Sequence, residues 1–114
     1  MEHIMNLNPS PFLMIKNGTK TIELRLYDEK RRKISQGDTI RFHNNADAGE
    51  TILTKVTGLY VFDTFDELYE NLPLLECGYT EDNISSASAR DMDKYYSLEM
   101  QKQYGVIGIR VVVI

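Results

Sequence analysis

The most constraining feature of the chain is the strand pattern that follows Gly18. Apolar residues recur there at every second position, as in a strand with one buried face. The apolar positions are Ile22, Leu24 and Leu26. The alternate positions, which share the opposite face, are Thr21, Glu23, Arg25 and Tyr27. With Lys20 at the start of the strand, these polar side chains predict a site for a polar, anionic or planar ligand.

The length and composition of the chain predict one domain spanning residues 1–114. With 114 residues the chain can build one hydrophobic core but not two. It has no apolar run near the roughly 18 residues of a membrane helix, and no secretory signal pattern at its start. Its one cysteine, Cys77, cannot form an internal disulfide. These features predict a cytoplasmic protein with no membrane segment, metal or other cofactor.

Charge is distributed unevenly along the chain, whose net charge is −4. Residues 16–41 contain eight basic and four acidic residues, a net charge of +4, and the remainder nets −8. A lopsided field can steer an anion to one face of an acidic protein. The alternative is that the basic run Lys30–Lys33 is only a solvated turn.

Several other segments predict short elements joined by turns. A helix is expected from Ser10–Pro11 to Gly18, because serine caps helices, proline fits the first turn and glycine ends them. The sequence Thr64–Glu67 forms a capping box that starts another helix, which Pro73 ends. Strands are expected near residues 20–27, 39–43, 51–62 and 105–114.

A third helix is expected from about residue 88 to about residue 103, and Glu99 falls within its apolar stripe. An unpaired buried charge costs several kcal/mol, so this acid needs a partner. Glu99 is therefore expected either to pair with Arg110 or Arg25, or to act as a ligand acceptor or general acid.

The order of these elements predicts the fold class. One helix, three strands, two helices and a final strand, with short early links, favour antiparallel neighbours. We therefore expect an α+β fold with a small mixed or antiparallel β-barrel and flanking helices.

Lys20, Glu23 and Arg25 are the strongest candidates for chemistry. Arg25 offers a planar fork for a phosphate, a carboxylate or a nucleobase edge. Lys20 could act as a base or nucleophile if burial lowered its pKa, and Tyr27 could stack on a base. The alternative is an ion-pair array on an exposed strand, in which each contact contributes about 0 to 1 kcal/mol.

Three segments resemble the ASCH domain of the PUA-like superfamily. They are Ile15–Arg25, Gly37–Phe42 and Tyr104–Ile109, and the similarity extends over about Met5 to Val113. The resemblance implies a small β-barrel with flanking helices and a cleft beside the first segment. It also implies RNA or nucleotide binding.

One branch of that family is similar in the first segment and acts as a small amidohydrolase on acetylated cytidine. The resemblance implies that Lys20 would be its nucleophile. Where that branch has a threonine, this chain has Glu23. The replacement of threonine by glutamate removes a hydroxyl and adds a charge. A catalytic glutamate of the branch falls in the segment matching Leu75–Thr80, where Glu76 is the nearest acid.

Three hypotheses follow from the sequence. The first is a module that binds RNA, a nucleoside or a nucleotide. Its expected ligand-binding residues are Lys16, Lys20, Thr21, Glu23, Arg25, Tyr27 and Glu99. The second is a hydrolase of a modified cytidine nucleoside, with Lys20, Glu23 and Glu76 as catalytic residues. The third is a non-catalytic interaction module, and none of the three defines an oligomeric state.

Overall fold

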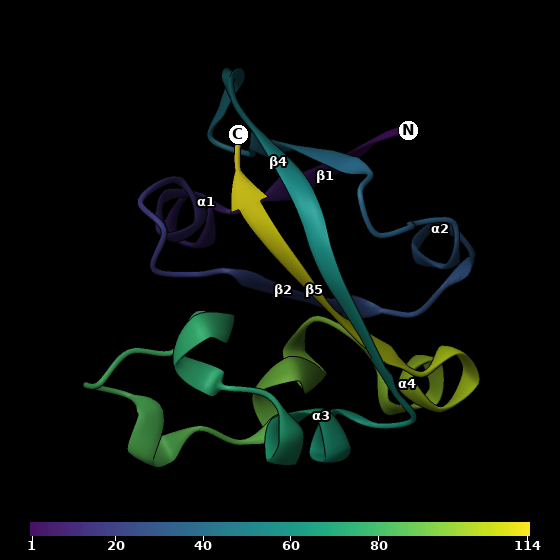
Figure 1. Ribbon diagram of the computed structural model, residues 1–114. Helices are drawn as coiled ribbons and strands as arrows, with labels where there is room; N and C mark the ends of the chain where they lie inside the picture. The colour runs from purple at the N-terminus through teal and green to yellow at the C-terminus, as the bar shows by residue number, and fades with distance from the viewer.

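A strongly curled, mixed β-sheet forms the centre of the protein. The computed structural model describes residues 1–114. The strands are β1 (Glu2–Leu7), β2 (Ile22–Leu26), β3 (Thr39–Asn44), β4 (Asp47–Phe62) and β5 (Val106–Val113). Their spatial order is β1-β3-β4-β5-β2, with β1 and β3 parallel and all other neighbours antiparallel. The sheet curls into a half-barrel, which confirms the predicted α+β class (Figure 1).

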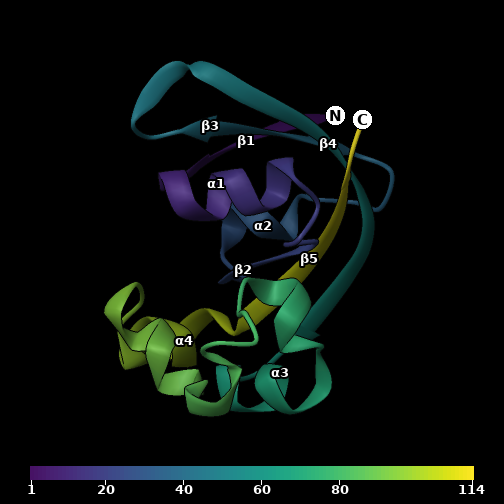
Figure 2. The same cartoon turned by 90° about the vertical axis from the view of Figure 1, so that its left-hand side faces the viewer.

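Helical elements lie at two places around the half-barrel. The α-helices are α1 (Pro9–Lys16), α2 (Glu29–Arg32), α3 (Phe65–Asn71) and α4 (Leu98–Tyr104). Three 3-10 helices follow α3 in the chain: η1 (Leu74–Cys77), η2 (Ile84–Ser86) and η3 (Ala89–Lys94). Figure 2 shows α1 and α2 between the β1–β3 side of the sheet and β2, whereas the elements from α3 to α4 form a separate layer beyond β2. No helix is both long and apolar enough to cross a membrane.

Two elements differ from those expected from the sequence. Strand β1 was not predicted, because one of its three inward positions carries His3 rather than an apolar side chain. The helix expected from residue 88 to residue 103 is wrong: η3 ends at Lys94, and α4 begins after Ser97. The Ser97 hydroxyl accepts a hydrogen bond from the amide of Met100 and so caps a new helix.

Strand β2 lies between two hydrophobic cores and contributes its apolar side chains to one of them. Its apolar side chains, Ile22, Leu24 and Leu26, pack in the core that joins the sheet to the helical layer. On its other face Glu23 lies opposite Ile109 and Arg25 lies opposite Ile107. Both isoleucines belong to the core inside the half-barrel. The polar face of β2 therefore points into the half-barrel, because directly paired residues share one face of a sheet.

A glycine lets the helical layer approach the sheet closely. A Cβ atom on Gly108 would lie 2.6 Å from Leu72 Cδ1 and 3.2 Å from Ile22 Cγ2. Real side chains do not tolerate the shorter of these separations without displacement. Gly108 on β5 thus provides the space into which Leu72, just after α3, packs.

The half-barrel is open between its two edge strands, β1 and β2. Helix α1 connects these strands in the chain and contacts β1 and β3. Across the opening, Arg25 Nη2 donates a hydrogen bond of 2.9 Å to the carbonyl oxygen of Asn6 on β1. A polar side chain of the candidate site therefore bridges the two edges.

Candidate functional site

A tight turn after α1 delivers Lys20 to the start of β2. Gly18 has a φ of 84°, in the left-handed region that glycine adopts without strain. The amides of Thr19 and Lys20 both donate to the carbonyl oxygen of Met14, each at 3.0 Å. The side chain of Asn17 accepts a further hydrogen bond from the amide of Thr19. These bonds fix the backbone that positions Lys20 relative to the strand.

Lys20, Glu23 and Arg25 form one ion-paired cluster, which we call the β2 triad. Lys20 Nζ lies 2.8 Å from Glu23 Oε1, and Arg25 Nε lies 2.7 Å from Glu23 Oε2. The side chains of these three residues are 10%, 4% and 15% exposed, respectively. The structure therefore joins the three strongest sequence candidates, in a largely buried setting rather than on an exposed outer wall.

The electrostatics of the β2 triad favour the charged forms of Glu23 and Arg25. Burial by itself would raise the pKa of Glu23, but the Lys20 ammonium and Arg25 guanidinium outweigh it and hold that pKa below its ordinary value. Burial opposes the charge of Arg25, yet the Glu23 carboxylate raises the Arg25 pKa overall. Two cations thus share one carboxylate, so the triad carries a net charge of +1.

A second polar cluster ties η1 to the start of β2. The Thr21 hydroxyl donates to Glu76 Oε1 at 2.8 Å, and Arg110 Nη1 donates to the same oxygen at 2.6 Å. The backbone amide of Thr21 also donates to the carbonyl oxygen of Glu76. Hydrogen bonds from Thr21 and Arg110 lower the pKa of Glu76. No hydrogen bond or ion pair joins Glu76 to Lys20 or Glu23.

The segment after Glu76 packs against the stem of Lys20. A Cβ atom on Gly78 would lie 3.4 Å from Lys20 Cδ. The neighbouring Cys77 is buried, and burial raises the pKa of its thiol to about 11. The thiol is therefore protonated at neutral pH and is a poor nucleophile.

A hollow of about 360 Å³ adjoins the β2 triad where α1 ends. Its polar side chains come from Lys16, Asn17, Lys20 and Thr21, and its apolar wall from Ile15 and residues 111–113. Three of the predicted ligand-binding residues, Lys16, Lys20 and Thr21, thus line one open space. Lys16 also pairs with Glu50 at 2.9 Å.

Tyr27 and Glu99 lie apart from this hollow. The guanidinium of Arg32 lies 4.2 Å from the centre of the Tyr27 ring, and Tyr27 packs against the core of the half-barrel. Glu99 is exposed on α4, because the new helix start at Ser97 turns it to solvent. The expected pairing of Glu99 is wrong: Arg25 pairs with Glu23, and Arg110 pairs with Glu76.

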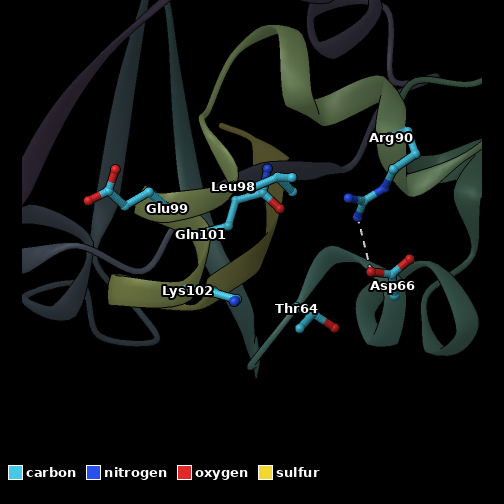
Figure 3. A pocket seen from close by; sticks show the side chains of 7 residues that line it. All are labelled: Thr64, Asp66, Arg90, Leu98, Glu99, Gln101 and Lys102. Atoms are coloured by element: carbon cyan, nitrogen blue, oxygen red, sulfur yellow. Dashed lines mark hydrogen bonds and ion pairs between the residues drawn. The ribbon is translucent and has the colours of Figure 1, made fainter.

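Glu99 instead borders a larger hollow of about 520 Å³ in the helical layer. The other residues lining it are Thr64, Asp66, Arg90, Leu98, Gln101 and Lys102. In Figure 3 Arg90 points to Asp66, with which it forms an ion pair of 3.0 Å, and Glu99 points to the opposite side. This hollow contains none of the residues of β2.

Sequence reasoning did not single out Arg31 or Tyr96 as individual site candidates. Arg31 on α2 was considered only as part of a basic run, although the spacing of Asp28 and Arg31 could have indicated an i,i+3 ion pair. Tyr96 comes from the connection between η3 and α4, and no periodicity relates it to β2. No group of three His, Cys, Asp or Glu side chains is arranged to hold a metal ion.

The chain belongs to the ASCH domain family, whose model matches residues 5–113. It is similar to the hypothetical protein PH0355, with a TM-score of 0.82, 34% identity and coverage of 100% of both chains. It is also similar to PF0455 from Pyrococcus furiosus, with a TM-score of 0.76, 32% identity and coverage of 100% of this chain and 98% of that one.

A mutant form of ZmASCH from Zymomonas mobilis shares the fold alone. Its TM-score is 0.67 at 14% identity, over 96% of this chain and 66% of that one. No curated protein matches this chain.

Proposed function

We propose that this ASCH domain protein binds RNA or a nucleotide at the β2 triad and the adjoining hollow. The observation that carries the proposal is the sharing of one buried carboxylate, Glu23, by the two cations Lys20 and Arg25. Taking three charges out of water costs several kcal/mol per ion before their attraction is counted. An apolar set of similar volume would be at least as stable, so a role in binding explains the presence of these charges.

The chemistry of the β2 triad suits an anionic ligand with a planar edge. Glu23 holds the guanidinium of Arg25 by Nε, and Asn6 accepts from Nη2. Only two of the five guanidinium N–H groups of Arg25 are therefore used within the protein. Lys20 adds an ammonium group with three N–H donors. Its one ion-pair partner within the protein is Glu23. The unused donors and the charge of +1 favour a phosphate or a nucleobase edge.

The surrounding surface supports the same ligand. Lys16 and Thr21 line the hollow next to Lys20. The volume of the hollow falls within the range of small-ligand sites. Unpaired RNA bases and their phosphates can enter such a space, whereas a duplex keeps its bases paired and stacked.

The hydrolase hypothesis receives less support from the geometry. A lysine nucleophile must present its nitrogen to the substrate, but Lys20 Nζ is engaged by Glu23 Oε1 at 2.8 Å. A general acid must carry a proton, but Thr21 and Arg110 favour the ionised form of Glu76. Turnover of acetylcytidine by the wild-type protein, together with its loss in Lys20→Ala, would nevertheless establish hydrolysis as the function.

Fluorescence polarisation with short, labelled, single-stranded RNAs tests the proposal. We expect wild-type protein to bind, Lys20→Gln and Arg25→Gln to bind about tenfold or more weakly, and each loss to reduce the salt slope by about 1. Lys55→Gln is the matched control, because Lys55 is exposed on β4 and the charge change is the same.

Two further measurements make the outcome decisive. Circular dichroism melting of each variant separates a loss of affinity from a loss of folding. Arg25→Lys keeps the charge but removes the planar fork, so it should restore the salt slope without restoring full affinity. Equal affinities for wild type, Lys20→Gln and Lys55→Gln, or no RNA or nucleotide binding by wild type, would contradict the proposal.

A further inference from the structure

The last residues of β5 have one edge that the sheet does not use. The amide of Val111 donates to the carbonyl oxygen of Thr21 at 2.8 Å, on the β2 side. The amide of Ile114 donates to the carbonyl oxygen of Leu53 at 3.1 Å, on the β4 side. The backbone polar groups of successive residues leave a strand on opposite edges, so the N–H and C=O of Val113 point to the β2 side, as those of Val111 do.

Strand β2 does not complete this edge. Its pairing with β5 ends at Ile22 and Arg110. The amide of Thr21, the next residue outward, donates to the carbonyl oxygen of Glu76 at 2.9 Å. The C=O of Val111 therefore receives no hydrogen bond from the residue that would pair with it.

The turn after α1 keeps the chain from pairing with Val113. In the register of β2 and β5, the residue opposite Val113 would be Thr19. The Thr19 amide donates to the carbonyl oxygen of Met14 at 3.0 Å instead, because the turn at Gly18 joins this segment to α1. An unused strand edge is a ready site for a ligand with its own donors and acceptors.

The hollow of about 360 Å³ lies at this unused edge. Residues 111–113 line one side of it, residues 15–18 line another, and Lys20 and Thr21 complete it. The edge offers three free groups in the order acceptor, donor, acceptor: the C=O of Val111 and the N–H and C=O of Val113. These are too few for an added peptide strand, which binds through a longer row of main-chain hydrogen bonds, but they match one edge of a nucleobase.

The order of the three groups distinguishes the four RNA bases. Its complement is donor, acceptor, donor. The Watson–Crick edge of adenine presents the N6 amino donor, the N1 acceptor and the C2–H group, which is a weak donor. In the same three-point arrangement, cytosine, guanine and uracil each place at least one oxygen acceptor against a carbonyl of the strand. Adenine is therefore the base that this edge favours.

We propose that the unused edge of β5 binds the adenine base of a nucleotide, free or within single-stranded RNA, in the hollow. The inference rests on the proposed function and adds the identity of the base to it. The C=O of Val111 accepts from the N6 amino group, the N–H of Val113 donates to N1, and the C=O of Val113 faces C2–H. Lys16 and Lys20 line the same hollow, and they are the cations available to the phosphate of that nucleotide.

Nucleotide analogues test each hydrogen bond on the wild-type protein. Purine riboside monophosphate lacks only the amino group of AMP, and 1-deaza-AMP lacks the N1 acceptor. We expect each analogue, and also UMP, to bind about tenfold more weakly than AMP. The monophosphate of 2,6-diaminopurine riboside supplies the second strong donor and should bind more tightly than AMP. An oligouridylate with one adenosine, compared with AMP, shows whether RNA or the free nucleotide is preferred.

NMR spectroscopy of the wild-type protein locates the base. The amide signal of Val113 should shift as AMP is added and saturate with the affinity measured by fluorescence polarisation. The amide of Val112, which points to the β4 side, is the internal control and should shift less. No shift of the Val113 amide, or equal affinities for AMP and UMP, would overturn the inference. A shift caused by acetyl-trialanine amide but not by AMP would also overturn it, in favour of peptide strand addition.

A pair of variants removes the central donor. Val113→Pro lacks the N–H group, which the sheet does not use, and proline is tolerated at such edge positions. We expect Val113→Pro to bind AMP about tenfold more weakly and to lose the preference for AMP over 1-deaza-AMP. Val113→Ala keeps the N–H group and should retain that preference. Circular dichroism melting verifies that both variants fold.

The outcomes separate this inference from the proposed function. RNA binding that depends on Lys20 but shows no preference for adenine would overturn the inference and leave the proposed function standing. The absence of binding to any RNA or nucleotide would remove both.

Discussion

The half-barrel and the helical layer differ sharply in charge, although a single strand, β2, lies between their two hydrophobic cores. The helical layer, residues 63–104, contains ten acidic and three basic residues and nets −7, whereas the rest of the chain nets +3. The apolar face of β2 packs against the helical layer, and its charged face points into the half-barrel. An anionic partner is thus repelled by one region and attracted by the other, with β2 at the boundary.

The two faces of β2 also differ in what they contribute to folding. Ile22, with 0% exposure, and its apolar neighbours stabilise the contact with the helical layer by removing apolar surface from water. Glu23 and Arg25 on the other face are held by ion pairs whose desolvation offsets much of their attraction. The difference teaches that the strand anchors the fold with its apolar face, whereas the ion pairs of its charged face contribute little net stability.

Removing the central acid of the charged face is expected to have the largest effect. In Glu23→Ala the cations Lys20 and Arg25 remain largely buried without their shared partner, so the free energy of unfolding should fall by about 3 to 5 kcal/mol. Urea denaturation at neutral pH measures the change.

The matched control replaces the entire triad with apolar residues of similar size. Lys20→Met, Glu23→Leu and Arg25→Met in one protein should be as stable as wild type or more so, and it should not bind RNA. A loss below about 1 kcal/mol for Glu23→Ala would mean that water screens the triad, which would remove the contrast between the two faces.

Disturbing the apolar contact between the two regions should have an intermediate effect. Gly108→Ala places a Cβ atom where Leu72 packs, and it should lower the free energy of unfolding by about 1 to 3 kcal/mol. Thermal unfolding followed by near-ultraviolet circular dichroism reports the tyrosines of the helical layer. Gly49→Ala is the control, since its new Cβ atom meets nothing closer than 3.5 Å. Adding Leu72→Ala to Gly108→Ala should recover part of the lost free energy of unfolding, because it removes the atom that the new Cβ would meet. If nothing is recovered, the contact with Leu72 is not the source of the destabilisation.

Acid should weaken both regions, with the smallest effect of the three changes, and one carboxylate in each region provides a test. In the half-barrel, hydrogen bonds from His3 and the Ser35 amide lower the pKa of Asp38 from its ordinary 3.8 to about 2. A carboxyl group with a lowered pKa in the folded state stabilises the protein above its ordinary pKa. That stability is lost as the pH falls through about 4 toward about 2. Asp38→Asn should therefore flatten the dependence of the unfolding free energy on pH in this range.

Asp91 provides the corresponding test in the helical layer. Its pKa is lowered by hydrogen bonds from the Tyr79 hydroxyl and the Ser88 amide, so Asp91→Asn should also flatten the acid limb. Urea denaturation at a series of pH values measures both variants. An unchanged acid limb in Asp38→Asn would show that β1 is not held through His3 and Asp38.

The local patterns of the chain predicted most of the elements and a part of the site. The alternation around Ile22 predicted β2 and both of its faces, and Thr64 caps α3 as expected by accepting from the amide of Glu67. The pairing of β4 with β5 shifts register between Val56 and Gly58, so this irregularity of the sheet also coincides with a glycine. These features depend on residues close together in the chain, where side-chain periodicity and capping act directly.

Most of what the sequence did not predict depends on contacts between distant residues, and one failure depends on a local helix break. Strand β1 forms because β3 pairs with it in parallel, and that partner lies more than thirty residues away. Glu99 was assigned to a buried stripe because the break at Ser97 could not be distinguished from a helix interior by periodicity alone. The hydrogen bond from Arg25 to Asn6 joins two edge strands whose proximity depends on the curl of the whole sheet.

The sequence by itself determined which residues of β2 face the apolar core and which carry charge, because that choice follows from the period of two in a strand. It also determined that Lys20 follows a glycine turn and that the basic residues gather in one part of the chain. Only the tertiary structure decided that Glu23 would be buried between Lys20 and Arg25. The reason is that burial, ion pairing and the balance of charge depend on distances between segments, and folding of the sheet and its helical layer sets those distances.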